Sequence, residues 1–593
     1  SGAMDLVFFN AQHLGSSLRM GETYVFFGRV EDDLRRKQMI NPLFEPEGRQ
    51  QVTGRIMPIY PLTAGVTQGL MARVARQGLD ACRELLPDVL PDEVRQAHKL
   101  CYVNYAYENI HFPASPEALE VARRRLVFEE LFVLSTAMAR IRSQRRAEGG
   151  IRMQNADLET FYRTLPFSPT GAQRRAVAAA VQDMTSGVPM SRLVQGDVGS
   201  GKTLVAAACI WFAHENDCQS AFMAPTEILT EQHEHTLRTL LEPFGIRVGR
   251  LTGAMTARQK REVKEALAGG LLDVVVGTHA LISDSVTFFR LGLVITDEQH
   301  RFGVEQRAAL VRKGEQPHTL VMSATPIPRT LALLVYGDLD VSIIDELPPG
   351  RQPVQTVCVD ERYRARLNAF IDKLIGEGRQ VFVVCPKVEE TDDVPSDLKS
   401  AEEHAQALQR TFPQHRVACI HGRMKAKDKD ACMAAFAAGE TDILVSTTVI
   451  EVGVDVPNAA LMLIENAECF GLSQLHQLRG RVGRGRHKSY CVLVSDNKGE
   501  ETKQRLKVMS STSDGFAIAE EDLKLRGPGD FFGSRQHGLP SLRVADLSCD
   551  LSLLHETQSA AEQLLAADPA LKNHPLLRAR VELLFELNAD AMN

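Results

Sequence analysis

A chain of 593 residues is long enough for roughly four domains, at about 100–200 residues each. It contains 68 Lys and Arg against 75 Asp and Glu, a net charge of −7, with 44% hydrophobic and 24% charged residues. These proportions exclude a disordered chain, a collagen-like fibre and a coiled coil, and they disfavour a uniformly basic nucleic-acid coat. Binding to DNA or RNA would therefore need local basic patches on an acidic body.

The cysteines and the apolar stretches bear on the compartment. The eleven cysteines form no C-x-x-C pair, and several lie in apolar runs such as LVAAACIWF, which favours buried, reduced thiols over disulfides or a zinc site. No apolar stretch is long enough for a transmembrane helix, and no signal-peptide pattern opens the sequence. We therefore expect a cytoplasmic protein without a membrane partner. The first four residues, SGAM, are typical of a tag remnant.

The N-terminal part predicts strands followed by helices. Residues 1–60 contain the short β-branched and aromatic runs LVFFNAQ, ETYVFFGRV and QVTGRIMPIY, which are typical of strands. Residues 61–154 predict helices, including a long one, ALEVARRRLVFEELFVLSTAMARIRSQRR, with apolar residues at helical spacing. The arginines of this helix suit either a solvated face or a surface that follows DNA phosphates, and the pattern leaves both interpretations open.

From residue 155 onward, apolar strand-like runs alternate with helical stretches. This pattern predicts parallel sheets covered by helices on both faces, in one α/β domain over 155–347 and a second over 348–497. The Pro- and Gly-containing stretch 345–354 is the expected linker between them. Residues 498–593 predict helices around a glycine-rich patch, DLKLRGPGDFFGSRQHG. The predicted fold class is therefore a multidomain α/β protein.

A phosphate-binding loop is the strongest single motif. Residues 196–203, GDVGSGKT, match G-x-x-x-x-G-K-[ST] between a predicted strand and a predicted helix. The glycines allow backbone N–H groups to turn toward phosphate at the positive end of that helix. We predict that Lys202 holds the β- and γ-phosphates of ATP and that Thr203 ligates Mg²⁺. The predicted loop glycines are Gly196, Gly199 and Gly201.

Two acidic residues at the end of a buried strand extend this site. Asp297 and Glu298 follow the apolar run LGLVIT, where unpaired carboxylates would be costly. An ATPase gives them a role, because Asp297 can hold Mg²⁺ and Glu298 can polarise the attacking water. The sequence thus predicts catalytic acids beside the phosphate-binding loop, with ATP and Mg²⁺ as cofactors.

The second α/β domain offers a candidate for the other side of the site. Arg481 and Arg484 lie in QLHQLRGRVGRGRHK, which is either a basic surface loop or the source of an arginine finger. A finger would neutralise the charge that grows on the γ-phosphate, so hydrolysis would depend on the approach of the two domains. We predict both arginines as catalytic, with Arg484 the better candidate.

A family resemblance now becomes visible. GDVGSGKT, APTEIL, DEQH, SATPIPRT, STTVIEVGVDVP and QLRGRVGR, in this order, resemble the motifs of superfamily 2 helicases. The stretches DEQHRFGVEQR and LRGPGDFFGSRQ narrow the match to the RecG family of bacterial DNA helicases, over almost the whole chain. The resemblance implies two tandem RecA-like motor domains, a partial OB-like wedge over 1–60, a helical linker over 61–154, and a helical-hairpin translocation motif with C-terminal helices over 498–593.

The same resemblance assigns further residues by motif. Phe167 and Gln173 would recognise adenine, and Gln299 and His300 would link the γ-phosphate site to the second domain. Gly453 and Asp455 would also contact the nucleotide. The positions that the resemblance assigns to DNA contact or coupling are Pro225, Thr226, Gly277, Thr278, Ser323, Thr325, Thr447, Arg526, Arg535 and Gln536.

The resemblance also implies a function and partners. An ATP-dependent double-stranded DNA translocase would regress stalled forks and process Holliday junctions, as a monomer associated with the bacterial nucleoid, with single-stranded-DNA-binding protein as a further partner. The sequence begins in what resembles the middle of the OB barrel, so we expect a truncated wedge and poor fork unwinding. Two alternatives remain open: a transcription-repair coupling translocase that acts on RNA polymerase, and a nucleotide-gated DNA-binding scaffold with little turnover.

Overall fold

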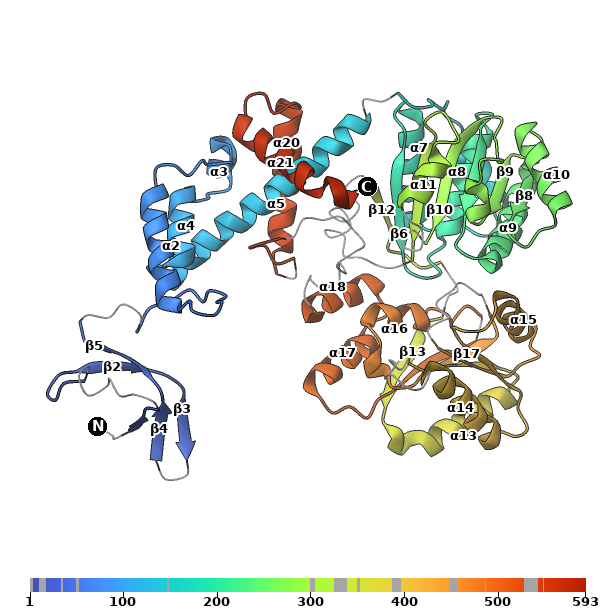
Figure 1. Cartoon of the computed structure of the whole chain (residues 1–593). Coiled ribbons are helices and arrows are strands. Elements are labelled where there is room, and N and C mark those ends of the chain that lie inside the picture. The colour runs from blue at the N-terminus through green and yellow to red at the C-terminus, as the bar shows by residue number, and fades with distance from the viewer. Residues whose placement is uncertain are drawn as a thin grey trace. The chain divides into compact units, whose positions relative to one another are not determined.

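Two parallel β-sheets dominate the computed structural model, as the alternating apolar runs predicted (Figure 1). The first has the strand order β12-β6-β11-β10-β7-β9-β8, and the second has the order β13-β18-β17-β14-β16-β15. Every strand pair in both sheets is parallel, so the carboxyl ends of the strands share one edge of each sheet. The fold-class prediction is confirmed.

The structure describes the chain outside a set of short gaps, and it divides into two compact units. The first unit comprises 1–136, 541–546 and 552–586, and the second comprises 137–540, 547–551 and 587–593. The residues outside the description are 1–3, 10–17, 34–35, 49–52, 147–148, 299–303, 325–338, 349–351, 387–395, 448–455, 486, 527–541, 548 and 593.

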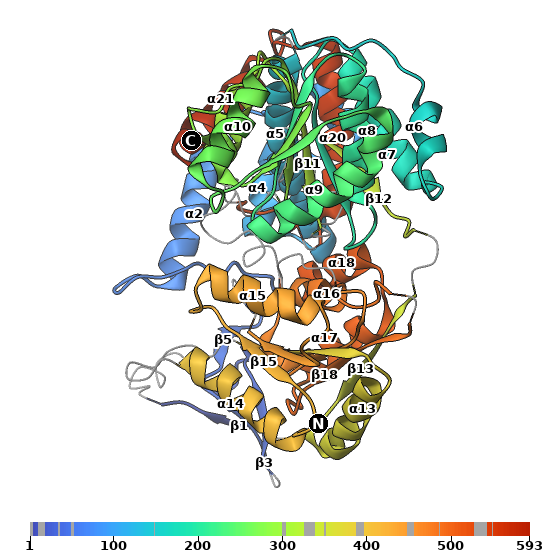
Figure 2. The same cartoon turned by 90° about the vertical axis from the view of Figure 1, so that its right-hand side faces the viewer.

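The first α/β domain of the second unit buries apolar side chains on both faces of its sheet. Helices α6 to α9 cover one face, where Trp211 and Phe212 of α8 lie in the core, and α10 and α11 cover the other. Figure 2 shows α10 on the opposite side of the strands from α7 and α8. The strands are β6 (Ser191–Gly196), β7 (Gln219–Met223), β8 (Val248–Leu251), β9 (Val274–Gly277), β10 (Leu291–Asp297), β11 (His318–Ser323) and β12 (Asp340–Ile344). The helices are α6 (Leu158–Thr164), α7 (Gly171–Thr185), α8 (Lys202–His214), α9 (Glu227–Leu241), α10 (Ala257–Ala268) and α11 (Val304–Val311).

The second α/β domain repeats this plan. Helices α13 and α14 cover one face of its sheet, and α15 to α18 contribute to the core on the other. The strands are β13 (Val354–Val359), β14 (Gln380–Val384), β15 (Val417–Ile420), β16 (Ile443–Ser446), β17 (Ala459–Ile464) and β18 (Ser489–Val494). The helices are α13 (Arg364–Gly376), α14 (Ser396–Thr411), α15 (Ala426–Ala437), α16 (Leu472–Arg479), α17 (Glu500–Ser511) and α18 (Gly515–Arg526). The predicted helical hairpin near 499–523 corresponds to α17 and α18.

The first unit joins small sheets to a helical cluster. Strands β1, β4 and β3 form one sheet and β2 and β5 form another, with Phe44 in contact with the rings of Phe8, Tyr24 and Phe26. On α5, the buried Arg125 bonds to Asp88, Glu129 and the Cys101 carbonyl. The elements are β1 (Asp5–Val7), β2 (Tyr24–Phe27), β3 (Val30–Asp33), β4 (Arg36–Ile40), β5 (Leu43–Pro46), α2 (Gln68–Cys82), α3 (Asp92–Ala97), α4 (Val103–His111), α5 (Pro116–Arg146), α20 (Leu551–Ala567) and α21 (Pro575–Met592).

C-terminal helices return to the N-terminal ones within this unit. Arg124 of α5 pairs with Glu556 of α20 at 2.9 Å, and the hydroxyls of Ser135 and Thr557 lie 3.4 Å apart. Parts of the predicted helical region 61–154 and of the predicted C-terminal region 498–593 therefore pack together within this unit. Within the described residues, no helix combines the length and apolar character needed to span a membrane.

Candidate active site

A cavity of about 530 Å³ lies at the carboxyl ends of the strands of the first α/β domain. The loop after β6, the ends of β10 and β11 and the start of α9 form most of its wall, and the loop after α16 of the second α/β domain completes it. The predicted site residues that line this cavity are Gly199, Gly201, Lys202, Thr203, Pro225, Asp297, Glu298, Arg481 and Arg484.

The loop before α8 has the backbone that its glycines predict. Gly199 and Gly201 have φ angles of +78° and +84°, in the left-handed region that favours glycine. A Cβ on Gly201 would lie 2.2 Å from Nε2 of Gln173, so a side chain there would displace that amide. The loop therefore presents its backbone at the N-terminus of α8, where N–H groups and the helix dipole favour an anion.

Lys202, the first residue of α8, is buried beside the loop. Its Nζ donates to the carbonyl oxygens of Gly196 at 2.8 Å and Asp197 at 3.0 Å. Burial lowers the pKa of the Lys202 ammonium, and the carboxylates of Glu298 and Asp297 oppose that shift. The ammonium is thus held at the cavity wall by weak carbonyl partners that an incoming phosphate can replace.

The two predicted acids end β10 with different partners. Asp297 accepts a hydrogen bond from Nε2 of His233 on α9 at 2.8 Å. Burial alone would raise the pKa of the Asp297 carboxyl, but the His233 hydrogen bond and the Lys202 charge hold that pKa below its ordinary value. Glu298 has a φ of +52°, a conformation that non-glycine residues adopt rarely and mostly at functional positions.

The residues present fit a magnesium ion. Thr203 and Asp297 line the same cavity and offer a hydroxyl and a carboxylate, the oxygen donors that Mg²⁺ prefers. The hydrogen bond from His233 occupies Oδ2 of Asp297, and Oδ1 accepts the backbone N–H of Glu298 at 3.1 Å. An ionised Asp297 therefore keeps lone pairs for a cation or its bound water.

The two candidate arginines reach the cavity from the loop after α16. Arg481 is 6% exposed, and Nε of Arg484 donates to the carbonyl oxygen of Gly480 at 3.3 Å. Gly480 itself packs against the phosphate-binding loop, since a Cβ on Gly480 would lie 2.8 Å from Cβ of Val198. The second α/β domain thus brings guanidinium groups to the wall that carries Lys202.

The two predicted adenine-recognition residues lie outside the cavity wall that the described residues form. Phe167 is 48% exposed. Gln173 is 2% exposed, its Nε2 donates to the Ser200 carbonyl at 2.8 Å, and its Oε1 accepts from the Thr170 N–H at 2.9 Å. Gln173 therefore braces the phosphate-binding loop in this structure, and its predicted contact with adenine stays a prediction.

The residues predicted to contact DNA lie mostly at strand ends and are largely buried. Thr226 caps α9 by accepting the Leu229 N–H at 3.3 Å. Thr278 is 3% exposed, and its hydroxyl has no hydrogen-bond partner among the described residues. A Cβ on Gly277 would lie 2.5 Å from the Leu251 carbonyl oxygen, so that position requires glycine.

Two further predicted coupling residues end central strands. Ser323 ends β11 at 3% exposure, and Thr447 directly follows β16 at 4% exposure. Arg526 is the last residue of α18, and its side chain lies outside the description. The predicted site residues that lie wholly outside the described residues are Gln299, His300, Thr325, Gly453, Asp455, Arg535 and Gln536.

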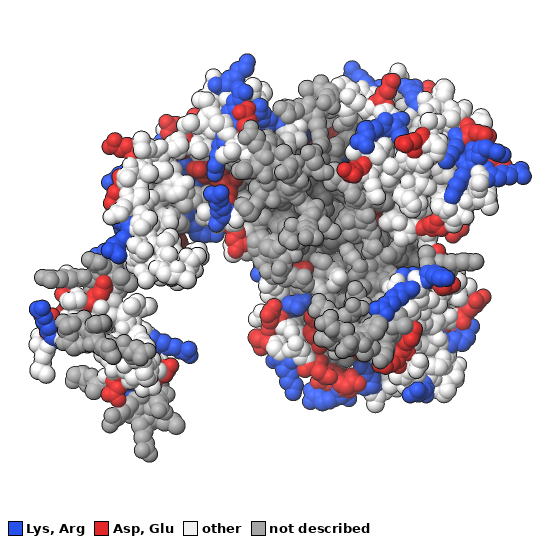
Figure 3. All heavy atoms as spheres, in the orientation of Figure 1, with Lys and Arg blue, Asp and Glu red and all other residues white. Residues whose placement is uncertain are grey.

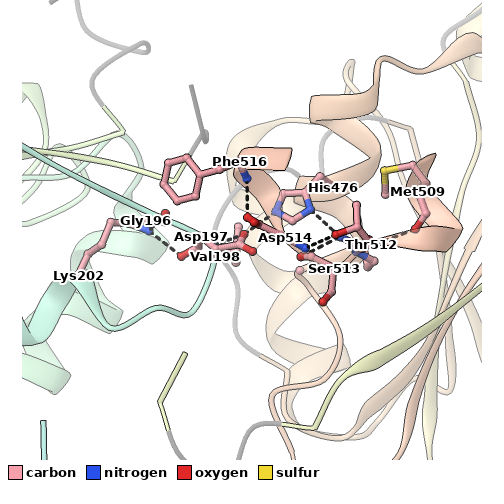
Figure 4. A network of polar contacts seen from close by, with 12 residues as sticks. Gly196, Asp197, Val198, Lys202, His476, Met509, Thr512, Ser513, Asp514 and Phe516 are labelled. Atoms are coloured by element: carbon pink, nitrogen blue, oxygen red, sulfur yellow. Dashed lines mark hydrogen bonds and ion pairs between the residues drawn. The ribbon is translucent and has the colours of Figure 1, made fainter. Parts of the chain in front are cut away.

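One set of contacts near the cavity was not predicted. His476 of α16 bonds through Nε2 to Oδ1 of Asp197 at 2.5 Å (Figure 4). Nη2 of Arg479 donates to Nδ1 of His476 at 2.8 Å. Because the Arg479 guanidinium can only donate, Nδ1 of His476 is the acceptor and Nε2 carries the proton that His476 donates to Asp197. Burial raises the pKa of the Asp197 carboxyl, but His476, the Val198 N–H and the Lys202 charge together hold that pKa below its ordinary value.

Arg479 extends this chain of hydrogen bonds to the turn between α17 and α18. Arg479 is buried, and its guanidinium donates to three backbone carbonyl oxygens at the end of α17 and in the turn that follows. We call the three side chains Asp197, His476 and Arg479 the loop-to-hairpin chain. The carbonyls that accept from Arg479 belong to Met509 at 2.9 Å, Thr512 at 2.8 Å and Ser513 at 3.2 Å.

Sequence reasoning missed these residues for different reasons. Asp197 and His476 lie inside the recognised stretches GDVGSGKT and QLHQLRGRVGR, and this position within the motifs was the signal that could have marked them as site residues. The pairing itself joins residues 279 positions apart, which no local pattern reveals. His233 had no motif signal at all, because it lies on the buried face of an amphipathic helix, together with Leu229 and Leu237.

Comparison with known proteins first defines the class. The profile described as DEAD/DEAH box helicase matches residues 170–334, and the profile described as Helicase conserved C-terminal domain matches residues 365–486. These ranges fall on the two α/β domains that line the cavity. The fold and the site therefore define a superfamily 2 helicase with two RecA-like domains.

The family follows from relatives over most of the chain. The chain is 44% identical to the ATP-dependent DNA helicase RecG of Bacillus subtilis, over 98% of this chain and 85% of that protein. It is 48% identical to the RecG of Synechocystis, over 90% of this chain and 64% of that protein. This chain belongs to the RecG family of ATP-dependent DNA helicases.

Two further profiles and one solved structure agree with this membership. The RecG wedge domain profile matches residues 1–82, and the profile of RecG domain 3, C-terminal, matches residues 512–584. A structure described as RecG bound to a three-way DNA junction has a TM-score of 0.74 and 44% identity, and the match covers 93% of this chain and 73% of that one. The alternative of a translocase acting on RNA polymerase gains no support from these comparisons.

Proposed function

We propose that this chain hydrolyses ATP in the cavity and uses the energy to move along double-stranded DNA and remodel branched DNA. The observation that carries the proposal is the shared cavity. Lys202 and Asp297 enter it from the first α/β domain, and Arg481 and Arg484 enter it from the second. Hydrolysis assembled from two domains is the arrangement that converts nucleotide turnover into domain motion.

The residues of the first α/β domain would bind and orient the nucleotide. The backbone N–H groups of the phosphate-binding loop and Lys202 would hold the β- and γ-phosphates. Thr203 and Asp297 would hold Mg²⁺, which neutralises charge on the phosphate oxygens when bound. The hydrogen bond from His233 keeps Asp297 ionised and fixes the orientation of its carboxylate.

The remaining catalytic roles concern water and developing charge. Glu298 would orient and deprotonate the attacking water, since its backbone places it directly after Asp297 at the cavity wall. Arg484, with Arg481 beside it, would neutralise the charge that develops on the γ-phosphate. Gln299, His300, Gly453 and Asp455 would complete the contacts between the nucleotide and the second domain. Phe167 and Gln173 would recognise adenine.

Branched DNA is the proposed substrate, with fork regression and Holliday junction processing as the activities. One support is that the similar solved structure is described as RecG bound to a three-way DNA junction. On the face shown in Figure 3, acidic and basic side chains are interspersed over both α/β domains. The four basic side chains of α10 illustrate this, because Arg258 and Arg261 pair with Glu262 and Glu265. DNA contact would therefore depend on local groups.

The proposed DNA-facing and coupling positions follow the helicase motifs. They occupy the loops after β7, β9 and β16, the end of β11, and the segment that follows α18. We further propose that the protein acts as a monomer in the bacterial cytoplasm, near the nucleoid, and binds single-stranded-DNA-binding protein. The boundaries predicted for the five regions of the chain stand as part of this proposal.

The test measures ATPase activity with linear duplex, single strands, three-way junctions and four-way junctions. We expect strong stimulation of the ATPase by junctions, with only weak regression of a model fork, and loss of both in Lys202→Ala. An ATPase rate that none of these DNA substrates changes would contradict the translocase proposal and favour the scaffold alternative. Equal stimulation by linear duplex and junctions, without fork regression, would support translocation and contradict branch specificity.

A further inference from the structure

Glu130 of α5 receives three consecutive backbone N–H groups from a distant part of the chain. Its Oε1 accepts from the N–H of Arg543 at 2.6 Å, and its Oε2 accepts from the N–H of Val544 at 3.0 Å and of Ala545 at 2.9 Å. The three donors are 413 to 415 positions away in the sequence, and both partners belong to the first unit.

This contact is stronger than ordinary packing between a loop and a helix. Hydrogen bonds to an ionised carboxylate are shorter and roughly twice as strong as neutral ones. Successive N–H groups that converge on one anion form a concave nest that fixes the backbone of the segment. Glu130 lies inside α5, a helix of 31 residues, so the acceptor is held by a rigid element.

A second observation fixes the same segment through its side chain. Val544 packs against the apolar cluster of Ala106, Ala122 and Leu126, which belongs to α4 and α5. The backbone of the segment is thus held by one carboxylate while its middle side chain is held by an apolar pocket. We call residues 543–545 the docked segment.

The position of the docked segment in the chain gives this contact its meaning. Helix α18 ends at Arg526 in the second unit, and residues 527–541 lead from it toward the docked segment in the first. Arg535 and Gln536, two of the proposed coupling residues, lie in that connection. The connection is therefore attached to α18 at one end and reaches its dock on α5 at the other.

We propose that Glu130 is a positioning residue that anchors the downstream end of the 527–541 connection and so couples ATP hydrolysis to DNA movement. The proposal rests on the proposed function and goes beyond it. Motion of α18 can pull on the connection only if the far end holds. Without the anchor, the far end yields, and ATP is hydrolysed with less displacement of DNA.

The experiment compares Glu130→Ala and Glu130→Gln with wild type and with Glu120→Gln, an exposed glutamate on the same helix. Hydrogen exchange of the amides of 543–545 measures anchoring directly. We expect their exchange to rise at least tenfold in Glu130→Ala and less in Glu130→Gln, because the amide keeps one acceptor oxygen. Glu120→Gln is expected to match wild type.

The coupling readout is the number of base pairs unwound per ATP hydrolysed on a three-way junction. We expect at least a fivefold fall in Glu130→Ala with kcat for ATP within twofold of wild type. Unchanged exchange of 543–545, or faster exchange with unchanged coupling, would overturn the proposal. If the wild-type protein unwinds no junction, the proposed function fails. The amide exchange of residues 543–545 in Glu130→Ala still decides, independently, whether Glu130 anchors the docked segment.

Discussion

The two α/β domains use the carboxyl ends of their corresponding strands in opposite ways. In the first, Lys202 opens α8 and faces Asp297 at the end of β10 across a cavity. In the second, Arg364 opens α13 and its guanidinium bonds with both nitrogens to Glu465, which directly follows β17. The first end is built to receive an external anion, and the second neutralises its own cation.

The scaffolds around these two ends correspond closely. Arg247 bonds to Asp273 and to the Gly270 carbonyl, and Arg416 bonds to Asp442 and to the Gly439 carbonyl, each across the same 26 positions. The acid at each strand end also lies near a histidine, since His233 is 2.8 Å from Asp297 and His404 is 3.4 Å from Glu465. The positions of these residues therefore correspond in the two domains. The chemistry differs at the start of the helix, where the first domain has Lys202 and the second has Arg364.

The difference lies in the connection before the helix. A glycine-rich loop precedes α8, whereas Asp360 and a short turn over Glu361–Tyr363 precede α13. Glu361 adds a second carboxylate to Arg364 at 2.7 Å. The second domain thus has a filled site where the first has a cavity, which leaves it to contribute Arg481 and Arg484 to the first domain's site.

The largest expected effect comes from removing the arginine that the second domain supplies. Arg484→Ala should lower kcat for ATP on the order of 10³-fold, because such a guanidinium neutralises charge in the transition state. Steady-state ATPase assays with a junction would measure this. Arg366→Ala, at an exposed position of α13, is the matched control. A loss below about tenfold would indicate that the second domain does not complete the site.

The filled site makes a prediction for acid stability. Burial raises the pKa of the Glu465 carboxyl, but the Arg364 guanidinium and His404 outweigh burial and lower that pKa from 4.5 to about 2. A depressed pKa stabilises the folded state above the unfolded value, so this stability is lost as pH falls from about 4.5 toward 2. The full shift corresponds to about 3 kcal/mol, at 1.36 kcal/mol per unit.

Hydrogen exchange of β17 amides between pH 5 and 2 would measure this loss in the whole chain. Glu465→Gln should flatten the pH dependence in that window, since no carboxyl remains to titrate. Parallel curves for wild type and Glu465→Gln would show that Glu465 does not carry the effect.

Removing only the cation tests the comparison from the other side. Arg364→Ala leaves a buried carboxylate without its main partner, and we expect the second domain to lose about 2 kcal/mol of stability. The ATPase of the folded protein should stay within threefold, because Arg364 lies outside the cavity wall formed by the described residues. Thermal unfolding and ATPase assays of the same samples would separate the two effects, and a catalytic loss without destabilisation would contradict the filled-site interpretation.

The open site was predictable from sequence because its signals are local. Gly199, Gly201 and Lys202 lie within a few positions, and each residue type has a backbone or charge requirement that the motif records. The filled site was not predictable, because Arg364 and Glu465 are 101 positions apart and neither belongs to a recognised motif. Alternating apolar runs gave the two sheets, yet contacts such as Glu130 with residues 543–545 use backbone donors that leave no trace in residue type.

The smallest expected effect concerns the loop-to-hairpin chain, which begins at the phosphate-binding loop of the open site. His476→Ala removes the partner of the half-buried Asp197 and one acceptor of the buried Arg479, at a cost of about 1–2 kcal/mol. We expect about a tenfold fall in the stimulation of ATPase by junctions. His476→Gln should restore most of it, since its amide can both donate and accept. Equal defects in both variants would show that the ring's packing matters and its hydrogen bonds do not.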